Sequence, residues 1–254
     1  MLEIQHLCAG YAGKQILHQV DLAIPENKVT VILGPNGCGK STLLKTLCGI
    51  VPVQQGQIRL HGEDLLRLMP KDRAKRISYL AQGQQLPHIT AYALVLQGRF
   101  PHVSYPFRYQ KSDHGRAQAA MEQMGIWEHR NALMEELSGG QRQKVYIAMA
   151  LTQDTPVILL DEPTTYLDIS HQLQLMALFR ELSRRNKTVV TVIHDIAHAF
   201  QIADQLVLMR DGKIICQGTP EEVYASGTLE AVFQVRLCRS RTPLGWHYYC
   251  EASE

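Results

Sequence analysis

The sequence predicts an α/β fold whose core is a parallel sheet, and two observations carry that prediction. First, residues 29–33, 157–160 and 189–193 are short apolar runs rich in β-branched side chains, which is typical of strands buried on both faces. Second, apolar side chains recur at helical spacing after two of these runs, at Leu175, Leu178, Phe179 and Leu182 and at Ile196, Ala199, Phe200 and Ala203. Strands and helices that alternate along the chain are the pattern of an α/β sheet.

Strands, turns and a helix start are also predicted outside this core. Apolar and polar side chains alternate in several stretches of residues 1–70, which predicts further strands. Asp211-Gly212 separates two apolar runs and predicts a hairpin turn. Thr219, Pro220 and Glu222 fit an N-cap, a first helical position and a capping-box acid, so a helix should begin there.

A mostly helical segment interrupts the predicted strands between about Gly83 and Gln153. Ser112 is a candidate N-cap for a helix that would end at Gly125. Its apolar stripe is formed by Ala117, Ala120, Met121 and Met124. We interpret the methionines as core packing rather than as ligands. Because the segment lies between strands, we expect it to form a subdomain.

Composition excludes several classes of protein. The 254 residues carry a formal net charge of +2, so no whole-chain attraction to nucleic acid or anionic lipid is expected. The apolar runs are far shorter than the roughly 18 residues of a membrane span, and residues 1–6 do not resemble a secretion signal. The six cysteines form no Cys-x-x-Cys pair, and we expect reduced thiols in a cytoplasmic protein.

The strongest chemical signal is a phosphate-binding motif. The pattern G-x-x-x-x-G-K-[ST] is matched by Gly34-Pro35-Asn36-Gly37-Cys38-Gly39-Lys40-Ser41, which Thr42 follows. The motif comes directly after the predicted strand 29–33 and opens an apolar helix. In this context, backbone amides and the helix N-terminus bind phosphates, Lys40 reaches the β- and γ-phosphates, and Ser41 binds Mg²⁺. We assign no redox role to Cys38.

Two acidic residues, Asp161 and Glu162, follow the apolar run 157–160. At the carboxyl edge of a parallel sheet, next to a phosphate-binding loop, Asp161 is suited to hold Mg²⁺. Glu162 can then act as general base on the attacking water. Taken alone, two acids at the end of a strand are equally consistent with a solvated turn.

A second anion site is predicted at Leu137-Ser138-Gly139-Gly140-Gln141. Ser138 could be a simple N-cap, but a serine hydroxyl and bare amides at a helix start also bind anions. The pentapeptide resembles the signature motif of ATP-binding-cassette (ABC) ATPases, and it occurs here together with the phosphate-binding motif. The resemblance covers essentially the whole chain.

The resemblance implies roles for residues outside these motifs. Tyr11 is similar to the aromatic residue that stacks on adenine, although an ordinary tyrosine at a strand end is the alternative. His194, which follows the predicted strand 189–193, resembles the histidine that contacts the γ-phosphate. Tyr166-Leu167-Asp168 resembles the loop that crosses to the partner subunit.

Gln82 resembles the glutamine that senses the γ-phosphate and Mg²⁺ and links the core to the helical segment. A surface glutamine is the alternative, because Gln84 and Gln85 lie close by in the sequence. The implied catalytic set is Glu162, His194, Gln82 and Lys40, and the implied magnesium ligands are Ser41, Gln82 and Asp161.

The resemblance also implies the fold and the assembly. The fold is that of a P-loop NTPase (RecA-like), with a parallel-sheet core, an N-terminal antiparallel β subdomain and an inserted α-helical subdomain. We expect a single ABC ATPase domain over residues 1–254, with the core and β subdomain in 1–82 and 154–254 and the helical signature subdomain in 83–153. The implied cofactors are ATP and Mg²⁺. Two copies should close over two ATP molecules as a homodimer.

Three local runs favour an importer branch of this family. They are Glu162-Pro163-Thr164-Thr165-Tyr166-Leu167-Asp168-Ile169, Gly98-Arg99-Phe100-Pro101-His102 and Gly218-Thr219-Pro220-Glu221-Glu222-Val223. They resemble ATPases that import ferric siderophores, haem or cobalamin, with a ferric-citrate type importer closest. The implied partners are two transmembrane permease subunits and, indirectly, a periplasmic or lipoprotein substrate-binding protein. The implied place is the cytoplasmic face of the cell membrane, with the permease docked around Gln82 and residues 86–102.

Other functions were weighed against this one. Cobalamin or haem is the alternative cargo. A nucleic-acid-associated or ribosome-associated ABC ATPase is a rival class, but residues 40–161 contain no heptad repeat and the chain holds a single cassette. The basic cluster Lys71, Arg73, Lys75 and Arg76 is short and contains Asp72, so we expect no nucleic-acid partner. A small-molecule kinase is the remaining rival, and the signature helix start would have no use in one.

Overall fold

The central element of the protein is a six-stranded sheet with the order β10-β9-β3-β8-β7-β6. It is seen in a computed structural model that describes residues 1–83, 86–106, 108–242 and 245–252. Its strands are β3 (Val29–Leu33), β6 (Ile77–Leu80), β7 (Val157–Asp161), β8 (Thr188–Val192), β9 (Gln205–Arg210) and β10 (Lys213–Gly218). β3, β6, β7, β8 and β9 run parallel, and β10 is antiparallel to β9. The parallel core predicted from the sequence is confirmed.

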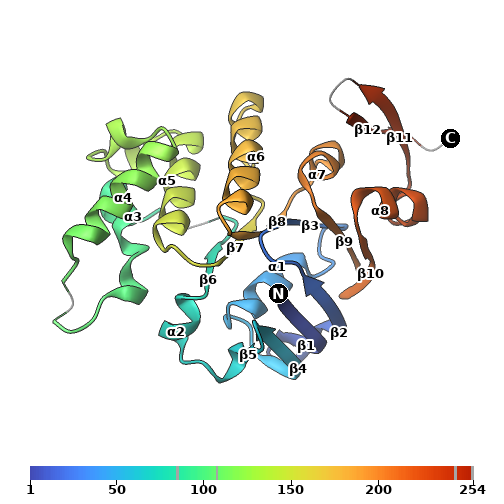
Figure 1. Cartoon of the computed structure of the whole chain (residues 1–254), viewed down its shortest axis with the longest axis horizontal. Helices are drawn as coiled ribbons and strands as arrows, with labels where there is room; N and C mark the ends of the chain where they lie inside the picture. Colours follow the sequence, from blue (N-terminus) through green and yellow to red (C-terminus); the bar gives the residue numbers. More distant parts are fainter. Residues whose placement is uncertain (84–85, 107, 243–244, 253–254) are drawn as a thin grey trace.

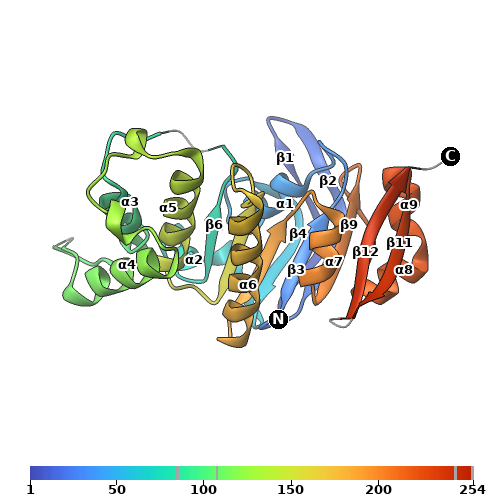
Figure 2. The same cartoon turned by 90° about the horizontal axis from the view of Figure 1, so that it is seen from above.

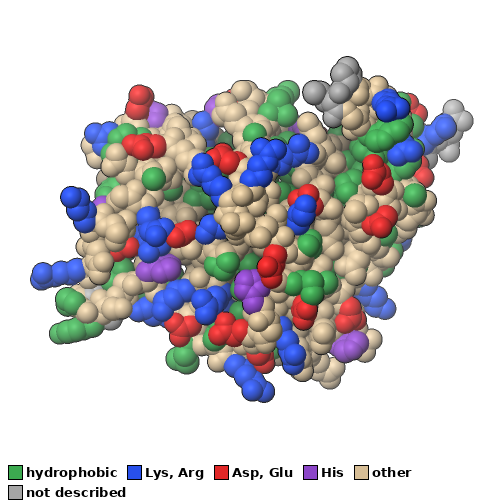
Figure 3. All heavy atoms as spheres, viewed as in Figure 1, with side chains coloured by type: hydrophobic (Ala, Val, Ile, Leu, Met, Phe, Trp, Pro, Cys, Tyr) green, Lys and Arg blue, Asp and Glu red, His purple; other side chains and the backbone are tan. Residues whose placement is uncertain are grey.

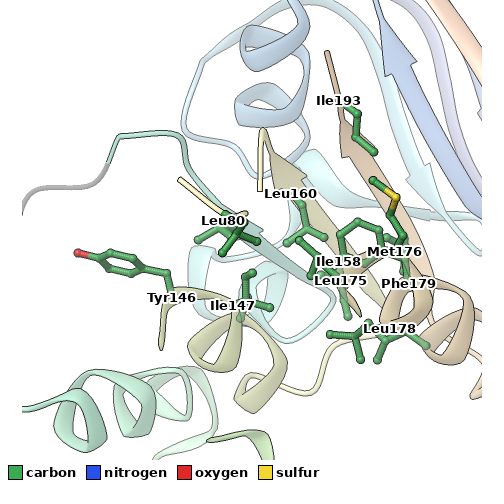
Figure 4. Close-up of a cluster of buried hydrophobic side chains, with 14 of the residues drawn as sticks. Leu80, Tyr146, Ile147, Ile158, Leu160, Leu175, Met176, Leu178, Phe179 and Ile193 are labelled. Carbon is green, nitrogen blue, oxygen red and sulfur yellow. The ribbon is translucent and has the colours of Figure 1, made fainter. Parts of the chain in front are cut away.

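The three central strands β3, β7 and β8 are buried along their whole length, as their continuous apolar runs indicate. Helices cover both faces of the sheet (Figures 1 and 2). On one face, α5 (Gly139–Thr152), α6 (Ile169–Arg184) and α7 (Ile196–Ile202) share a core with alternate residues of the strands. Figure 4 shows part of this core, where Ile158 and Leu160 of β7 meet Phe179 of α6. The other face packs on α1 (Lys40–Leu47).

A second, antiparallel sheet lies beyond α1 and has the order β2-β1-β4-β5. Its strands are β1 (Leu2–Tyr11), β2 (Lys14–Ile24), β4 (Val53–Leu60) and β5 (Glu63–Asp64). Leu43, Leu44 and Leu47 of α1 share one buried core with this sheet and with the main sheet. The helix that follows the phosphate-binding loop is therefore held between two sheets, which fixes the loop in place.

Helices α3 (Ala91–Gln97), α4 (Lys111–Gln123) and α5 lie together at one end of the molecule (green in Figure 1). A buried ion pair links the residues just after α3 to the first turn of α4: Arg99 Nε donates to Asp113 Oδ1 at 2.8 Å. The predicted N-cap Ser112 is wrong. The helix begins two residues earlier, at Lys111, with Gln110 as its N-cap, and Asp113 supplies the capping-box carboxylate to the Gln110 amide.

Short helical turns connect several of these elements. They are α2 (Pro70–Ala74) and the 3₁₀ turns Leu65–Arg67, Phe100–His102, Trp127–His129 and Met134–Glu136. In the described parts of the chain, no helix combines the length and the apolar character that crossing a membrane demands.

The C-terminal part follows the predicted turns and then adds a hairpin. Asp211-Gly212 joins β9 to β10, and Thr219 caps α8 (Pro220–Ser226) with Glu222 in a capping box, so both predictions are confirmed. After α9 (Thr228–Phe233), strands β11 (Val235–Thr242) and β12 (Gly245–Ala252) form a hairpin that sequence reasoning did not predict. It packs on α7 through Tyr248, whose ring centroid lies 4.5 Å from that of Phe200.

Candidate functional site

A pocket of about 410 Å³ opens at the carboxyl ends of β3, β6, β7 and β8. It is lined by Tyr11, Ile16, Asn36, Gly37, Gly39, Lys40, Ser41, Thr42, Gln82, Glu162 and His194. These residues come from five separate stretches of sequence. Parallel strands direct all their carboxyl ends to the same edge, which is why the loops after four strands meet there. All but Ile16 are residues that the sequence analysis had singled out.

The phosphate-binding loop bends through glycines with positive φ, at Gly34 (156°), Gly37 (77°) and Gly39 (106°). A Cβ on Gly34 would lie 2.2 Å from the Met209 carbonyl oxygen, so no larger residue fits there. Gly39 is the N-cap of α1 and no side chain caps the helix. The first amides of α1 therefore remain available to an anion, and the helix dipole adds positive potential.

Lys40 lies under this loop, with its side chain only 6% exposed. Its Nζ donates to the carbonyl oxygens of Gly34 at 2.7 Å and Pro35 at 2.9 Å. Two carbonyls cannot neutralise a buried ammonium as a phosphate can, so the charge suits an anionic ligand in this pocket. Cys38 is buried in the same loop, and burial raises the pKa of its thiol, which makes the thiolate scarce at neutral pH.

Asp161, at the end of β7, is 1% exposed. Ser41 Oγ donates to its Oδ1 at 3.0 Å and Tyr79 Oη donates to its Oδ2 at 3.1 Å. Burial raises the pKa of Asp161, while these two hydroxyls work in the opposite direction. Burial and the neighbouring Asp161 raise the pKa of Tyr79, so its phenol stays a proton donor.

The residues present fit a magnesium ion. A hydroxyl and a carboxylate in direct contact, next to a phosphate-binding loop, are the hard oxygen ligands that Mg²⁺ takes together with nucleotide phosphates. No group of three or more His, Cys, Asp or Glu side chains gathers as a metal cage in the described ranges.

Glu162 follows directly and adopts a positive φ of 52°. That unusual backbone conformation separates its side chain from that of Asp161 and directs it into the pocket. Gln82 Nε2 donates to Glu162 Oε2 at 2.5 Å, and His194 Nε2 lies 2.6 Å from Glu162 Oε1. Gln82 and His194, which the resemblance places at the γ-phosphate, are thus joined through the carboxylate of Glu162, the expected general base.

Tyr11 ends β1 at the margin of the pocket, with 46% of its surface exposed. An exposed aromatic ring beside a phosphate-binding loop is available for stacking on a base. Gln84 and Gln85, the sequence neighbours that compete with Gln82, lie outside the described residues. Gln82 itself is exposed and also lines the pocket, where its amide contacts Glu162.

The signature segment does not join this pocket. Ser138 caps α5, and its Oγ accepts from the Gln141 amide while Gln141 Oε1 accepts from the Ser138 amide. The predicted N-cap is confirmed. The segment faces a different pocket of about 500 Å³, which Ser138, Gly140 and Gln141 line together with Asp168.

Asp168 is the N-cap of α6 and accepts from the His171 amide at 2.9 Å and from His171 Nδ1 at 2.8 Å. The hydrogen bond from the His171 amide, with that from its ring, lowers the pKa of Asp168. Tyr166, just before it, has a positive φ of 68°, and a Cβ built on Gly139 would contact its side chain at 3.5 Å. The phosphate-binding loop and the signature segment therefore line two different pockets of the same chain.

Comparison with known proteins decides the family. The model of the ABC transporter family matches residues 17–165, which hold the phosphate-binding loop, the signature segment and Glu162. The chain belongs to the ABC transporter family. It is an ATPase of the ABC type, as the import ATP-binding proteins below are.

Two curated relatives cover nearly the whole chain. The iron(3+)-hydroxamate import ATP-binding protein FhuC of Bacillus subtilis (strain 168) is 40% identical over 92% of this chain and 88% of its own length. The ferric enterobactin transport ATP-binding protein FepC of Escherichia coli (strain K12) is 41% identical over 91% of this chain and 86% of its own length.

Solved structures agree with the fold of this ABC ATPase. A metal-chelate type ABC transporter in an inward-facing conformation is similar with a TM-score of 0.83 and 26% identity, over 98% of this chain and 97% of that one. The dimeric bacterial ABC transporter cassette MJ0796 is similar with a TM-score of 0.77 and 27% identity, over 87% of this chain and 99% of that one. The expected P-loop NTPase fold with its antiparallel β subdomain is confirmed.

Proposed function

We propose that this chain is the energy-coupling ATPase subunit of a bacterial importer for ferric siderophores. The observation that carries the proposal is the separation of two half-sites. Lys40 and Glu162 line one pocket, while Ser138 and Gly140 line another. Such a chain completes its sites only with a partner, and the relatives named above serve ferric-hydroxamate and ferric-enterobactin import.

At the first half-site, Lys40 and the amides at the start of α1 bind the phosphates of ATP, and Tyr11 stacks on the adenine. Ser41, Asp161 and Gln82 hold Mg²⁺, which supplies charge neutralisation at the phosphates when bound. Glu162 removes a proton from the attacking water, and His194 orients Glu162 and contacts the γ-phosphate. The contacts of Glu162 with Gln82 and His194 support this division of roles.

At the second half-site, the first amides of α5 bind the γ-phosphate of an ATP held by the other subunit. Ser138 and Gln141 keep this helix start in shape through their capping box. Asp168 sits beside it on the loop between β7 and α6, which connects Glu162 to the subunit interface. The similarity to a dimeric cassette supports a homodimer that closes over two ATP molecules.

The helical region 83–153 is proposed as the subdomain that passes this closure to two transmembrane permease subunits at the cytoplasmic face of the membrane. A substrate-binding protein takes part indirectly. The proposed permease dock includes residues 86–102. Within it, Leu94, Val95 and Leu96 are buried in the core, so they are not available for a contact with the permease. Phe100, which is 63% exposed, and Leu86, which is 44% exposed, remain as the large exposed apolar side chains of the proposed dock.

The nucleic-acid alternative is disfavoured by the contacts of the basic cluster. Lys75 pairs with Asp72, Arg76 with Glu63, and Arg73 and Lys71 donate to backbone carbonyls. On the face shown in Figure 3, Lys and Arg side chains are interspersed with Asp and Glu rather than gathered into a single-sign stripe. A phosphate-backbone partner needs such a stripe.

The proposal is tested by radio-iron uptake in source cells that carry either the unchanged chain or Glu162→Gln, with iron supplied as several ferric chelates. We expect the variant to lose uptake of a ferric siderophore. Loss of cobalamin or haem uptake instead would keep the ATPase and change the cargo. If no uptake changed, the importer function would be wrong.

A further inference from the structure

The two adjacent acids at the end of β7 each have a partner from the β6 side of the sheet. Tyr79, inside β6, donates its phenol hydroxyl to Asp161 at 3.1 Å. Gln82, just after β6, donates its amide to Glu162 at 2.5 Å. Gln82 already has a proposed role at the γ-phosphate. Tyr79, in contrast, belongs to none of the sequence motifs described above.

The backbone register explains how Tyr79 reaches Asp161. In the parallel pairing of β6 with β7, Tyr79 lies opposite Leu159. Asp161 is two residues beyond Leu159, so both side chains point to the same face of the sheet as Tyr79. The half-buried ring packs against the core that α1 shares with the sheet. Its hydroxyl reaches Oδ2 of the carboxylate, whereas the hydroxyl of Ser41 reaches Oδ1.

The two oxygens of Asp161 have separate hydroxyl donors. Ser41 Oγ lies 3.0 Å from Oδ1 and Tyr79 Oη lies 3.1 Å from Oδ2. These two donors satisfy a carboxylate that is only 1% exposed and fix its orientation. Ser41 belongs to the phosphate-binding loop and is itself a proposed magnesium ligand, whereas Tyr79 has no proposed role as a ligand.

We propose that Tyr79 is a positioning residue, which holds the Asp161 carboxylate in the orientation that binds the nucleotide-associated magnesium ion. This inference rests on the magnesium role proposed above for Ser41 and Asp161. Tyr79 is not among the residues that line the phosphate-site pocket, so we expect its effect to be confined to metal affinity. Groups that orient a metal-binding carboxylate in this way typically contribute about 10- to 100-fold to metal affinity.

The two acids differ in how their partners on the β6 side are held. Gln82 lies just after β6, at the start of the helical region. Tyr79 lies inside β6, which pairs with β7 over its whole length. The hydrogen bond from Tyr79 to Asp161 therefore joins two paired strands, whereas that from Gln82 to Glu162 lies beyond their paired ends.

The test compares the full chain with Tyr79→Phe, which removes only the hydroxyl. Binding of Mn²⁺, as a paramagnetic substitute for Mg²⁺, is measured by electron paramagnetic resonance with saturating ADP. ADP affinity is measured separately in EDTA. We expect the Mn²⁺ dissociation constant of Tyr79→Phe to rise about tenfold, with metal-free ADP affinity within about twofold of the unchanged chain. Tyr92→Phe, which removes a hydroxyl 2.6 Å from His114 in the helical region, is the matched control and should change neither quantity.

Asp161→Asn separates the inference from the function on which it rests. If Asp161→Asn weakens Mn²⁺ binding and Tyr79→Phe does not, the role of Tyr79 is wrong and the magnesium site stands. If Asp161→Asn leaves Mn²⁺ binding unchanged, the proposed magnesium site is wrong as well. An equal loss of metal-free ADP affinity in Tyr79→Phe would show a general disturbance of the pocket and would also overturn the inference.

Discussion

His194 Nε2 lies 2.6 Å from Glu162 Oε1, although the two residues are 32 positions apart in sequence. The two side chains meet because β7 and β8 are parallel neighbours whose ends lie at the same edge of the sheet. Glu162 is 13% exposed, while His194 is 50% exposed. Both residues line the pocket, but His194 is open to solvent while the Glu162 carboxylate is mostly covered.

This contact predicts that His194→Ala lowers ATP turnover by roughly 10²-fold, the usual size of a lost acid–base contribution. ATP binding should change by only a few fold, because Lys40 and the α1 amides carry the phosphate contacts. Steady-state ATPase assays and equilibrium binding check the two quantities. The control is His198→Ala, at a residue of α7 that pairs with Asp195. A similar loss of ATP turnover in His198→Ala would mean that the effect comes from disruption of α7.

Lys40→Ala should weaken ATP binding. Among the residues that the structure describes, the buried ammonium of Lys40 donates to the carbonyl oxygens of Gly34 and Pro35, and we assign it a charge-assisted contact with phosphate as well. Its loss should cost about 2 kcal/mol, which is roughly 30-fold in Kd. Equilibrium binding of ATP measures this, with Lys45→Ala in the last turn of α1 as control. Unchanged affinity of the Lys40 variant would count against the phosphate-binding assignment.

Separate half-sites predict complementation between two inactive variants. Lys40→Ala damages the phosphate-binding half-site, and Gly139→Asp places a negative charge at the start of α5. In a mixed dimer one composite site remains intact, so an equal mixture should recover about a quarter of the activity expected for two-fold symmetric dimers. ATPase assays of each variant and of the mixture decide this. A mixture as inactive as its parts would mean that the two half-sites do not combine.

The buried pair Arg99–Asp113 predicts a large effect on stability. Both side chains are less than a tenth exposed, and Arg99 also donates to the Thr152 carbonyl oxygen. Asp113→Ala leaves the guanidinium without its carboxylate and should lower the free energy of unfolding by about 3–5 kcal/mol. Urea unfolding at pH 7 measures this change. Asp72→Asn removes the exposed partner of Lys75 and should have little effect.

The same pair fixes the direction of a pH effect. Burial works to raise the pKa of Asp113, but hydrogen bonds from the Gln110 amide and Arg99 outweigh it and the pKa is lowered. The contribution of Asp113 to stability is therefore present above its unfolded pKa of about 3.9 and is lost as the pH falls through the lower folded value. Urea unfolding from pH 7 down to pH 3 should show this loss in the unchanged chain. A variant Asp113→Asn that lost stability over the same pH range to the same extent would contradict the assignment.

Local sequence signals predicted the elements that carry the site. The loop 34–41 was placed correctly between its strand and helix because glycines, lysine and an apolar run occur at fixed spacing. Ser112 failed as an N-cap because Gln110, a less common cap, forms a capping box with Asp113. Asp113 closes the capping box and also pairs with Arg99. Because that pair is a tertiary contact, local sequence alone does not decide between the two caps.

Contacts between strands were the part that the sequence could not supply. The bond from Tyr79 to Asp161 requires the register of β6 on β7, and a hydrophobic run alone does not set that register. The positive φ of Glu162 is equally hidden, since glutamate has no preference for it. The hairpin β11–β12 was missed because only Leu237 and Tyr248 in it are buried, so its apolar pattern is weak.

The most direct test of the account is the behaviour of Glu162→Gln with ATP and Mg²⁺. The account predicts that this variant binds ATP, sediments as a dimer in its presence, and hydrolyses it at least about 10²-fold more slowly than the unchanged chain. Analytical ultracentrifugation and an ATPase assay on the same sample give both quantities. Turnover near that of the unchanged chain, with no ATP-dependent dimer, would contradict the assignment of Glu162 as the base and of the two pockets as halves of one site.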